Sequence, residues 1–254
     1  MAHRVADRPS VARFERPANR ILRALPPSEY SRLALNLEPV RLPQKTLLQP
    51  VDERIDHVYF PVRGVASLVV TSANGEEVDT AIVGNEGMVG LPVFLGTDRM
   101  PLQAIVQVDM QGLRLSAADL RAELGHGGLL VNLLQRYTQM VLVELAQLIL
   151  CNRVHSLEHR ASRWILQMNE RIDGGSEFEI TQEFLASMLG ANRPKLSTVV
   201  HELREQGMIS YTRGRMMVTN SAALEANACA CYRTIRDELN RLLSTTELYD
   251  ITAG

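Results

Sequence analysis

Cationic and hydroxyl side chains gather toward the C-terminal end of this sequence of 254 residues. Between Thr181 and Arg215, lysine and arginine number five and glutamate three, whereas the formal charge of the whole chain is -2. Arginine and lysine can donate hydrogen bonds to the edge of a guanine, and hydroxyl groups can reach bases or phosphates. The chemistry open to these residues is therefore hydrogen bonding to nucleic acid, provided that one element presents them on an exposed face.

The segment that must position them predicts two helices joined by a sharp turn. Thr181 can cap the first helix, and Gly190 suits a turn that requires a positive φ angle. Ala186 is small where two helices must cross closely. The apolar face of the first helix holds Phe184, Leu185, Met188 and Leu189. We therefore expect a helix-turn-helix at Thr181 to Gly207.

The second helix of this motif would run to about Gln206 and place its N-terminal half in the major groove of duplex DNA. Its inward side chains would be Leu196, Val199, Val200 and Leu203. The side chains expected to read bases are Arg193, Lys195, Ser197 and Thr198. Those expected to hold phosphates are Thr181, Gln182, Asn192, Arg213 and Arg215, the last two at the tip of a hairpin at Met208 to Val218. The alternative is an unrelated helical subdomain with a surface hairpin.

The first half of the chain predicts short strands separated by turns. Asn74-Gly75 supplies residues tolerant of positive φ between two apolar runs, as a tight hairpin requires. The runs rich in Val, Ile and Leu are Val40 to Leu48, His57 to Phe60, Ala66 to Thr71, Val78 to Val83 and Gln103 to Val108. A meander or small barrel follows from this pattern. Ser116 is then the expected cap of a helix.

A long helix is expected from about Leu129 to Asn152, and it is apolar on two faces. One face has the spacing of a short coiled coil: Leu130, Leu134, Tyr137, Val141, Glu144 and Leu148. The residues expected at a dimer interface are Leu130, Leu134, Tyr137, Val141 and Leu148, with Glu144 counting against this interpretation. A helix that is apolar on two sides must bury both, which favours a homodimer over the alternative of a central helix in a monomeric core.

Composition indicates an ordinary globular chain of two domains, with 46% hydrophobic and 22% charged residues. Residues 1–19 are expected to form a flexible tail, because they carry several arginines without the apolar core of a signal peptide. The longest apolar stretch is too short to cross a bilayer, so no membrane role is expected. An odd number of cysteines, three, fits a reducing cytoplasm better than a disulfide scaffold.

With these elements in order, the chain resembles the Crp/Fnr family of bacterial regulators over nearly its full length. The most specific stretch is Gln182-Glu183-Phe184-Leu185-Ala186-x-Met188-Leu189-Gly190-x-x-Arg193, continued by Leu203-x-x-x-Gly207-Met208-Ile209. The resemblance implies an α+β fold: an antiparallel β-roll of cyclic-nucleotide-binding type, a long dimerisation helix and a winged helix-turn-helix. The corresponding parts would be a β-roll sensor domain at 20–126, a dimerisation helix at 127–153, a DNA-binding domain at 154–222 and a helical extension at 223–254.

The resemblance also places a ligand cassette, which the sequence only partly matches. The segment from Gly84 to Gly90 resembles the turn that leads into it, and the expected cassette residues are Gly84, Glu86, Gly87, Arg99 and Gln103. Relatives that bind cyclic AMP grip its phosphate with an Arg-Ser or Arg-Thr pair, where this chain reads Leu102-Gln103-Ala104. Control by cyclic AMP is therefore not expected, because a buried phosphate needs charge-assisted donors. The effector stays unknown.

Two further departures concern cofactors and the DNA sequence. Iron-sulfur sensing relatives use an N-terminal cysteine cluster, yet residues 1–150 contain no cysteine, so no such cluster and no other cofactor is predicted. Pro194 stands where many relatives place a base-reading glutamate. Proline is tolerated in a first helical turn but offers no side-chain hydrogen bond, so the preferred DNA sequence should differ.

Other residues that could do chemistry have simpler interpretations. Cys229 and Cys231 would point to different sides of an expected helix at Ala222 to Leu243 and lack further ligands nearby, which favours a structural role. His155 and His159 have the spacing of a metal pair but no third ligand, so they are expected to be surface or interface histidines, and no metal is predicted.

No enzymatic activity is expected, since the sequence has neither a phosphate-binding loop nor a nucleophile elbow, and His57 is the only histidine between Val40 and Leu115. The sequence thus predicts a cytoplasmic homodimer that binds a palindromic operator in double-stranded DNA and acts with RNA polymerase. The alternative is a regulatory subunit of cyclic-nucleotide type that controls another protein; it would keep the β-roll without needing the helix-turn-helix.

Overall fold

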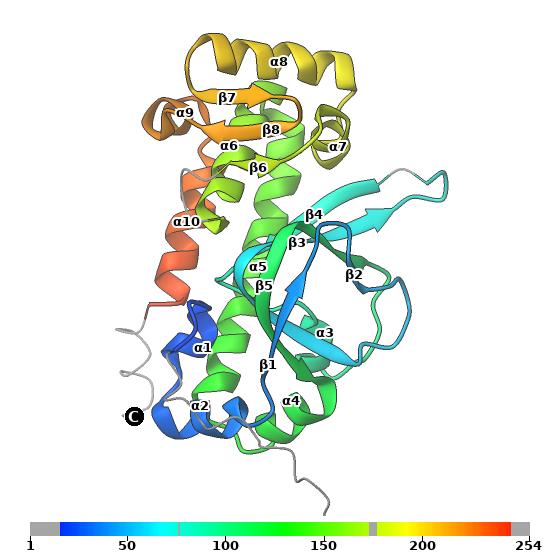
Figure 1. Cartoon of the computed structure of the whole chain (residues 1–254), viewed down its shortest axis with the longest axis vertical. Coiled ribbons are helices and arrows are strands. Elements are labelled where there is room, and N and C mark those ends of the chain that lie inside the picture. Colours follow the sequence, from blue (N-terminus) through cyan, green and yellow to red (C-terminus); the bar gives the residue numbers. More distant parts are fainter. Residues whose placement is uncertain (1–15, 76, 173–176, 245–254) are drawn as a thin grey trace, which may run out of the picture.

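The computed structural model describes residues 16–75, 77–172 and 177–244. Its elements form an antiparallel β domain, a long helix beside it, and a small helical domain with a three-stranded sheet at one end of that helix (Figure 1). The expected α+β fold is confirmed. Residues 1–15, most of the expected flexible tail, lie outside the described residues. Asn19, also placed in that tail by the sequence, is instead buried, and its amide donates to the carbonyls of Pro61 and Gly87 at 2.9 Å each.

The β domain is one antiparallel sheet in the order β1-β5-β3-β4, with β2 paired to β5. The strands are β1 (Glu38–Leu42), β2 (Leu47–Gln49), β3 (His57–Thr71), β4 (Glu77–Val83) and β5 (Gln103–Ser116). The expectation of one strand at Val40 to Leu48 was wrong, because the chain turns between β1 and β2 at Lys45, whose φ is +71°. The two strands expected within His57 to Thr71 are a single strand.

Gly64 lies where the pairing register between β3 and β5 shifts, and it allows β3 to continue as one strand. Its φ is +80°, and a Cβ atom there would lie 2.1 Å from the carbonyl oxygen of Asp109 on β5. Only glycine lets the two strands approach this closely while β3 bends. The hairpin between β3 and β4 is confirmed: the amide of Gly75 donates to the carbonyl of Ser72 at 2.9 Å.

Four short helices cover the end of the β domain: α1 (Arg20–Ala24), α2 (Pro27–Ala34), α3 (Leu91–Phe94) and α4 (Ala117–Leu124). The sequence predicted only α4, and its cap is confirmed, since the Ser116 hydroxyl accepts from the amide of Asp119 at 3.0 Å. These helices pack their apolar side chains against the first half of α5 (Leu129–Val154). Residues such as Ile21, Leu22 and Leu120 are fully buried there.

The expected dimer face of α5 is wrong for three of its five residues. Leu130, Leu134 and Tyr137 are buried within the single chain, in the core shared with α1, α2 and α4. Val141 and Leu148 are partly buried. The exposed apolar side chains of α5 are Leu142, Ile149, Leu150 and Val154. The reason for the error is that an apolar pattern around a whole helix does not reveal which face the rest of the chain covers.

A buried ion pair joins the β domain to the helices. Arg171 is the last residue of α6 (Leu157–Arg171), and its Nε lies 2.8 Å from Oε1 of Glu86, in the turn after β4. Glu144 of α5 lies 4.0 Å from the same guanidinium and accepts from Gln167 at 3.3 Å. The side chains of Arg171 and Glu86 are each only 5% exposed. Glu144 therefore faces the interior of this chain. It no longer counts against a dimer formed through α5, because it does not lie on an exposed face of that helix.

The C-terminal part begins with β6 (Phe178–Glu179) and continues through the elements α7 (Gln182–Met188), α8 (Arg193–Glu205), β7 (Ile209–Thr212), β8 (Arg215–Val218), α9 (Ser221–Asn227) and α10 (Cys231–Leu242). The single helix expected at Ala222 to Leu243 was wrong, because the chain leaves the helix at Ala228. Helix α10 runs back beside α5, as Figure 1 shows, with Met140 packed against Ile235 and Leu242. Among the described residues, no helix combines the length and the apolar character needed to span a bilayer.

The buried ion pair leads to a first prediction. Replacing Arg171 by alanine leaves Glu86 and Glu144 buried without their cation, which should lower the free energy of unfolding by about 3–5 kcal/mol. Urea unfolding at neutral pH measures the change. The matched control is Arg114→Ala, because Arg114 and Glu38 form a solvent-exposed pair at 2.5 Å that should contribute at most about 1 kcal/mol. Equal losses in the two variants would contradict the role given to Arg171.

Asp79 of β4 leads to a second prediction. Burial raises the pKa of Asp79 to about 7, although Trp164 and Ser67 donate hydrogen bonds to it. Its pKa in an unfolded chain is near 3.8, so folding binds a proton between these values and the free energy of unfolding falls as the pH rises from about 4 to about 7. Asp79→Asn removes this loss and should make the variant more stable than wild type by on the order of 1–3 kcal/mol at pH 8. Urea unfolding of both proteins at pH 4 and pH 8 tests this. If the free energies of unfolding of wild type and variant differed by the same amount at both pH values, the prediction would be contradicted.

Candidate nucleic-acid interface

Two capped helices form the expected helix-turn-helix. The Thr181 hydroxyl accepts from the amide of Phe184 at 3.1 Å at the start of α7. The side chain of Asn192 accepts from the amide of Lys195 at 3.1 Å at the start of α8. Gly190 lies between the helices with φ +56°, as the turn requires. The motif therefore arises from local sequence signals at each helix end.

Helix α8 separates apolar and polar side chains cleanly. Its inward residues Leu196, Val199, Val200 and Leu203 are buried, as expected, against α6 and the three-stranded sheet. The four expected base-reading residues are all exposed: Arg193, Lys195, Ser197 and Thr198. No ion pair holds Arg193 or Lys195 to a carboxylate among the described residues. Pro194 lies in the first turn of α8, where its missing N–H costs no helical hydrogen bond.

The expected phosphate-binding residues differ in their availability. Arg213 lies at the tip of the β7–β8 hairpin with φ +50° and is exposed. Arg215 also is exposed, but its guanidinium pairs with Glu177 at 3.2 Å and with Glu179 at 3.1 Å. The side-chain oxygens of Thr181 and Asn192 act as helix caps, which leaves the hydroxyl proton and the amide N–H groups to donate. Gln182 is partly buried.

The β7–β8 hairpin, which is the wing of the winged helix-turn-helix, lies close to the start of α8. The Tyr211 hydroxyl of β7 donates to the carbonyl of Ile180 at 3.1 Å, which ties the hairpin to the segment before α7. Burial raises the pKa of Tyr211, and the nearby positive charge of Arg193 opposes that shift. Tyr211 of the hairpin and Arg193 of α8 are therefore close to each other, as phosphate and base contacts on one duplex would require.

The helix-turn-helix rests on the β domain through a few polar contacts. The Ser187 hydroxyl of α7 donates to the carbonyl of Glu77 on β4 at 2.9 Å. The Gln44 amide donates to the carbonyl of Glu179 at 3.4 Å. A groove of about 570 Å³ lies between the β3–β4 hairpin and the turn that begins α8. The N-terminal end of α8 therefore lies beside the β domain in this conformation.

The expected ligand cassette is not assembled as one site. Glu86 is buried and engaged by Arg171, and the amide of Gly84 donates to Glu86 at 3.0 Å. A Cβ atom at Gly87 would lie 2.3 Å from the hydroxyl of Tyr137 on α5. This turn therefore packs against the helices. The other two expected residues have separate partners, since exposed Arg99 donates to the carbonyl of Asp52 and Gln103 donates to Glu77.

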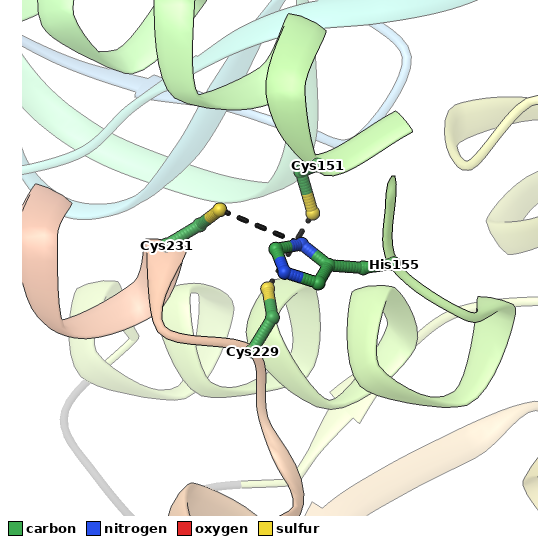
Figure 2. Close-up of side chains that lie close together, drawn as sticks. All are labelled: Cys151, His155, Cys229 and Cys231. Carbon is green, nitrogen blue, oxygen red and sulfur yellow. Dashed lines mark hydrogen bonds between the residues drawn. The ribbon is translucent and has the colours of Figure 1, made fainter. Parts of the chain in front are cut away.

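Four residues that the sequence analysis did not group together meet near the N-terminal end of α6, as Figure 2 shows: Cys151, His155, Cys229 and Cys231. The expectation that Cys229 and Cys231 point to different sides without nearby ligands was wrong. Cys229 precedes α10 in a non-helical turn, so its side chain is free to point to the same centre as Cys231. Cys151 lies in the last turn of α5, 78 residues before Cys229, so no local spacing could have indicated that it joins the cluster. His159, which the sequence predicted to be a surface or interface histidine, is exposed on α6.

Hydrogen bonding within this cluster changes the acidity of the thiols. The sulfurs of Cys151 and Cys229 lie 3.5 Å apart. Their hydrogen bond holds the pKa of Cys151 well below its usual range and raises the pKa of Cys229. Burial raises the pKa of Cys231, whose sulfur lies 3.7 Å from Nδ1 of His155. One sulfur of the cluster therefore favours the thiolate form.

Comparison with known proteins assigns the two domains separately. Residues 39–126 match the cyclic nucleotide-binding domain family, and residues 159–227 match the Crp-like helix-turn-helix domain family. The chain is 25% identical to the CRP-like cAMP-activated global transcriptional regulator of Mycobacterium tuberculosis over 222 residues, which cover 82% of this chain and 96% of that protein.

Solved structures share the fold at lower identity. FixK2 from Bradyrhizobium japonicum superposes with a TM-score of 0.65 at 16% identity, covering 76% of this chain and 98% of FixK2. A transcriptional regulator of the CRP/FNR family from Thermus thermophilus superposes with a TM-score of 0.58 at 19% identity, covering 75% of this chain and 98% of that structure. With a β domain and a helix-turn-helix that each match the corresponding family, in the family's order, this chain is a member of the Crp/Fnr family of transcriptional regulators.

Proposed function

We propose that the protein is a cytoplasmic, non-enzymatic transcription factor that binds a palindromic operator as a homodimer and responds to a signal other than cyclic AMP. The observation that carries this proposal is the face of α8 on which Arg193, Lys195, Ser197 and Thr198 are all exposed. Among the described residues, neither of the two cations has an ion-pair partner. An exposed row of donors on a recognition helix has no packing role, and it matches what the edges of bases offer in the major groove.

Each group on this surface has a chemical task in the proposed complex. Arg193 would donate two hydrogen bonds to a guanine, and Lys195 would donate to a neighbouring base or phosphate. Ser197 and Thr198 would reach bases or phosphates one turn further along α8. Arg213 would place its charge on the DNA backbone beside the groove, since it is exposed at the tip of the hairpin. Arg215 would have to exchange its two glutamates for a phosphate.

The proposed dimer would use the exposed stripe of α5. Leu142 is 62% exposed and Ile149 is 73% exposed, seven residues apart on the same face. Leu145 lies between them at coiled-coil spacing. Such a stripe is costly to leave in water, and a second copy of the same helix would cover it with two-fold symmetry. Two-fold symmetry would present the two α8 helices to successive major grooves about 34 Å apart.

The β domain supports a signal different from cyclic AMP. Its interior is filled by apolar side chains that include Val83, Ala104, Val106 and Met110. The cyclic phosphate would need a buried cation, and Arg99 is exposed on a loop while Arg171 is already engaged by carboxylates. The regulator of Mycobacterium tuberculosis is described as activated by cAMP. Among the described residues of this chain, neither Arg99 nor Arg171 is placed to bind a cyclic phosphate inside the β domain. A signal would act by shifting α5 and α6, and any effect on RNA polymerase would follow from operator occupancy.

Base reading by α8 makes a third prediction. Arg193→Ala should weaken binding to the duplex that the wild-type protein prefers by about 1–3 kcal/mol and relax the preference at one base pair of each half-site. Arg213→Ala should weaken binding to all duplexes alike and reduce the slope of log K against log salt by about 1. Fluorescence anisotropy over a salt series measures both effects. Arg54→Ala, in the β domain, is the control and should change neither. An Arg193→Ala protein with unchanged affinity and preference would show that another face of α8 enters the groove.

The α5 stripe makes a fourth prediction. Ile149→Glu places a charge in the proposed seam and should convert the dimer to a monomer in sedimentation velocity at micromolar concentration. Operator affinity should fall with it, because each chain would then bind a half-site alone. The matched control is Leu35→Glu, since Leu35 follows α2, is 81% exposed and does not belong to the α5 stripe. A wild-type protein that sediments as a monomer, or an Ile149→Glu protein that stays dimeric, would contradict the proposed seam.

A further inference from the structure

Three cysteines and a histidine converge where α5 meets α6 and α10. Cys151 is the fourth-last residue of α5, and His155 follows the end of that helix. Cys229 and Cys231 come from the turn that begins α10. The ligand atoms of all four residues lie within 4.8 Å of one another, and Figure 2 shows the three sulfurs arranged around the imidazole. Such a set of sulfur and nitrogen atoms is the donor chemistry that Zn²⁺ prefers in structural sites.

We propose that Cys151, His155, Cys229 and Cys231 hold one zinc ion in a tetrahedral site. With Zn–S bonds of about 2.3 Å and Zn–N bonds of about 2.0 Å, the ligand atoms of a tetrahedral site lie roughly 3.5–3.8 Å apart. The Cys151 and Cys229 sulfurs are 3.5 Å apart, and the Cys231 sulfur is 3.7 Å from Nδ1 of His155. The four ligands therefore need little movement to take up one ion. An iron-sulfur cluster would require its cysteines to spread around two or more irons.

The surroundings suit a metal site with a net negative charge. Three thiolates and one Zn²⁺ carry a charge of -1, which needs a nearby cation when the site is buried. All three cysteines are buried. Arg163 of α6 is also buried, attracts the Cys151 thiolate by its charge, and has an Nε atom without a hydrogen-bond partner among the described residues. Arg160, one turn earlier, interacts electrostatically with the same thiolate. The positive charges of Arg163 and Arg160 would therefore offset the negative charge of the zinc-bound site.

The position of the site indicates what the metal would do. The ion would connect the end of the long helix α5, the linker to α6 and the start of α10. Asn227 of α9, two residues before Cys229, donates to Ser162 of α6 at 3.0 Å, so a hydrogen bond also ties α9 to α6. Zinc would hold the angle between α5 and α6, and with it the place of α8 relative to the β domain. All four ligands belong to one chain, and the site does not depend on the proposed function.

Metal binding by the purified full-length chain tests the proposal. The reduced, metal-free protein is titrated with Co²⁺ as a spectroscopic probe and then with Zn²⁺. We expect one Co²⁺ per chain, with the sulfur-to-cobalt charge-transfer and tetrahedral d–d absorption bands, and full displacement of these bands by Zn²⁺. Zinc should also raise the thermal unfolding midpoint of the wild-type chain, because the ion binds only the folded state. Elemental analysis of protein purified without chelator should find zinc close to one per chain.

Ligand variants and a matched control complete the test. Cys229→Ser and Cys231→Ser should each lower zinc affinity by at least the roughly 10–100-fold that loss of an outer-shell partner costs a metal site. His159→Ala removes an exposed histidine of α6 next to the site and should leave affinity and spectrum unchanged. Both serine variants keep the remaining ligands, and circular dichroism before metal addition checks that each is folded.

Three outcomes would overturn the proposal. The first is a reduced wild-type chain that is folded and binds neither ion. The second is metal binding that the serine variants retain or that His159→Ala abolishes. The third is a chain that forms a Cys151–Cys229 disulfide in air and shows no zinc after purification in reductant, which would make the sulfurs a redox pair.

Discussion

The buried guanidinium of Arg171 joins three distant parts of the chain where the two domains meet. Arg171 closes α6, and it meets Glu86 from the β domain and Glu144 from the long helix α5. Desolvating these three charges is costly, and the cost is offset only when all three parts of the chain come together in this geometry. Three elements distant in sequence are therefore held in one relative position by a polar contact that tolerates little slippage. Gly84 belongs to the same constraint, since a Cβ atom there would lie 2.6 Å from the Arg171 side chain.

This constraint explains why the turn after β4 is not available to a ligand. In the family that the sequence resembles, this turn leads into a ligand cassette. In this chain, its acidic residue Glu86 instead accepts a hydrogen bond from Arg171 of α6. A signal at the β domain that moved this turn would move Arg171, and hence the start of the DNA-binding domain. The proposed zinc site lies near the N-terminal end of α6, opposite Arg171, and would hold that end of the helix to α5 and α10. Helix α6 is held at its C-terminal end by the Arg171 ion pair and along its length by the apolar core around Trp164 and Ile165.

Prediction from the sequence succeeded where the signals are local. The caps at Thr181 and Ser116, the turn at Gly190 and the hairpin at Asn74-Gly75 all depend on residues within a few positions of one another, and the structure contains each of them. The exposed face of α8 followed from the spacing of its apolar residues. The helix-turn-helix, whose turn and apolar spacing are among these local signals, also holds the most specific part of the resemblance to the family, which helped to predict the fold.

Prediction failed where the outcome depends on distant contacts. Helix α5 is apolar on most of its circumference, so its spacing could not show that Leu130, Leu134 and Tyr137 face the chain's own core. Glu86 matches a local motif, yet its role is decided by Arg171, 85 residues away. The cysteines were misjudged because a helix break at Ala228, invisible in the apolar pattern, turns Cys229 toward a partner on α5. In each case the missing information is which surfaces meet.

The central claim, that a dimer of this chain reads duplex DNA through two α8 helices, is tested most directly by selection of bound sequences from a random duplex pool. The purified protein is used at fixed salt, with and without cyclic nucleotides. The account predicts recovery of one two-fold symmetric site without added nucleotide, with half-sites about 10 base pairs apart. Recovery of an asymmetric single half-site, or no enrichment under any condition, would contradict it.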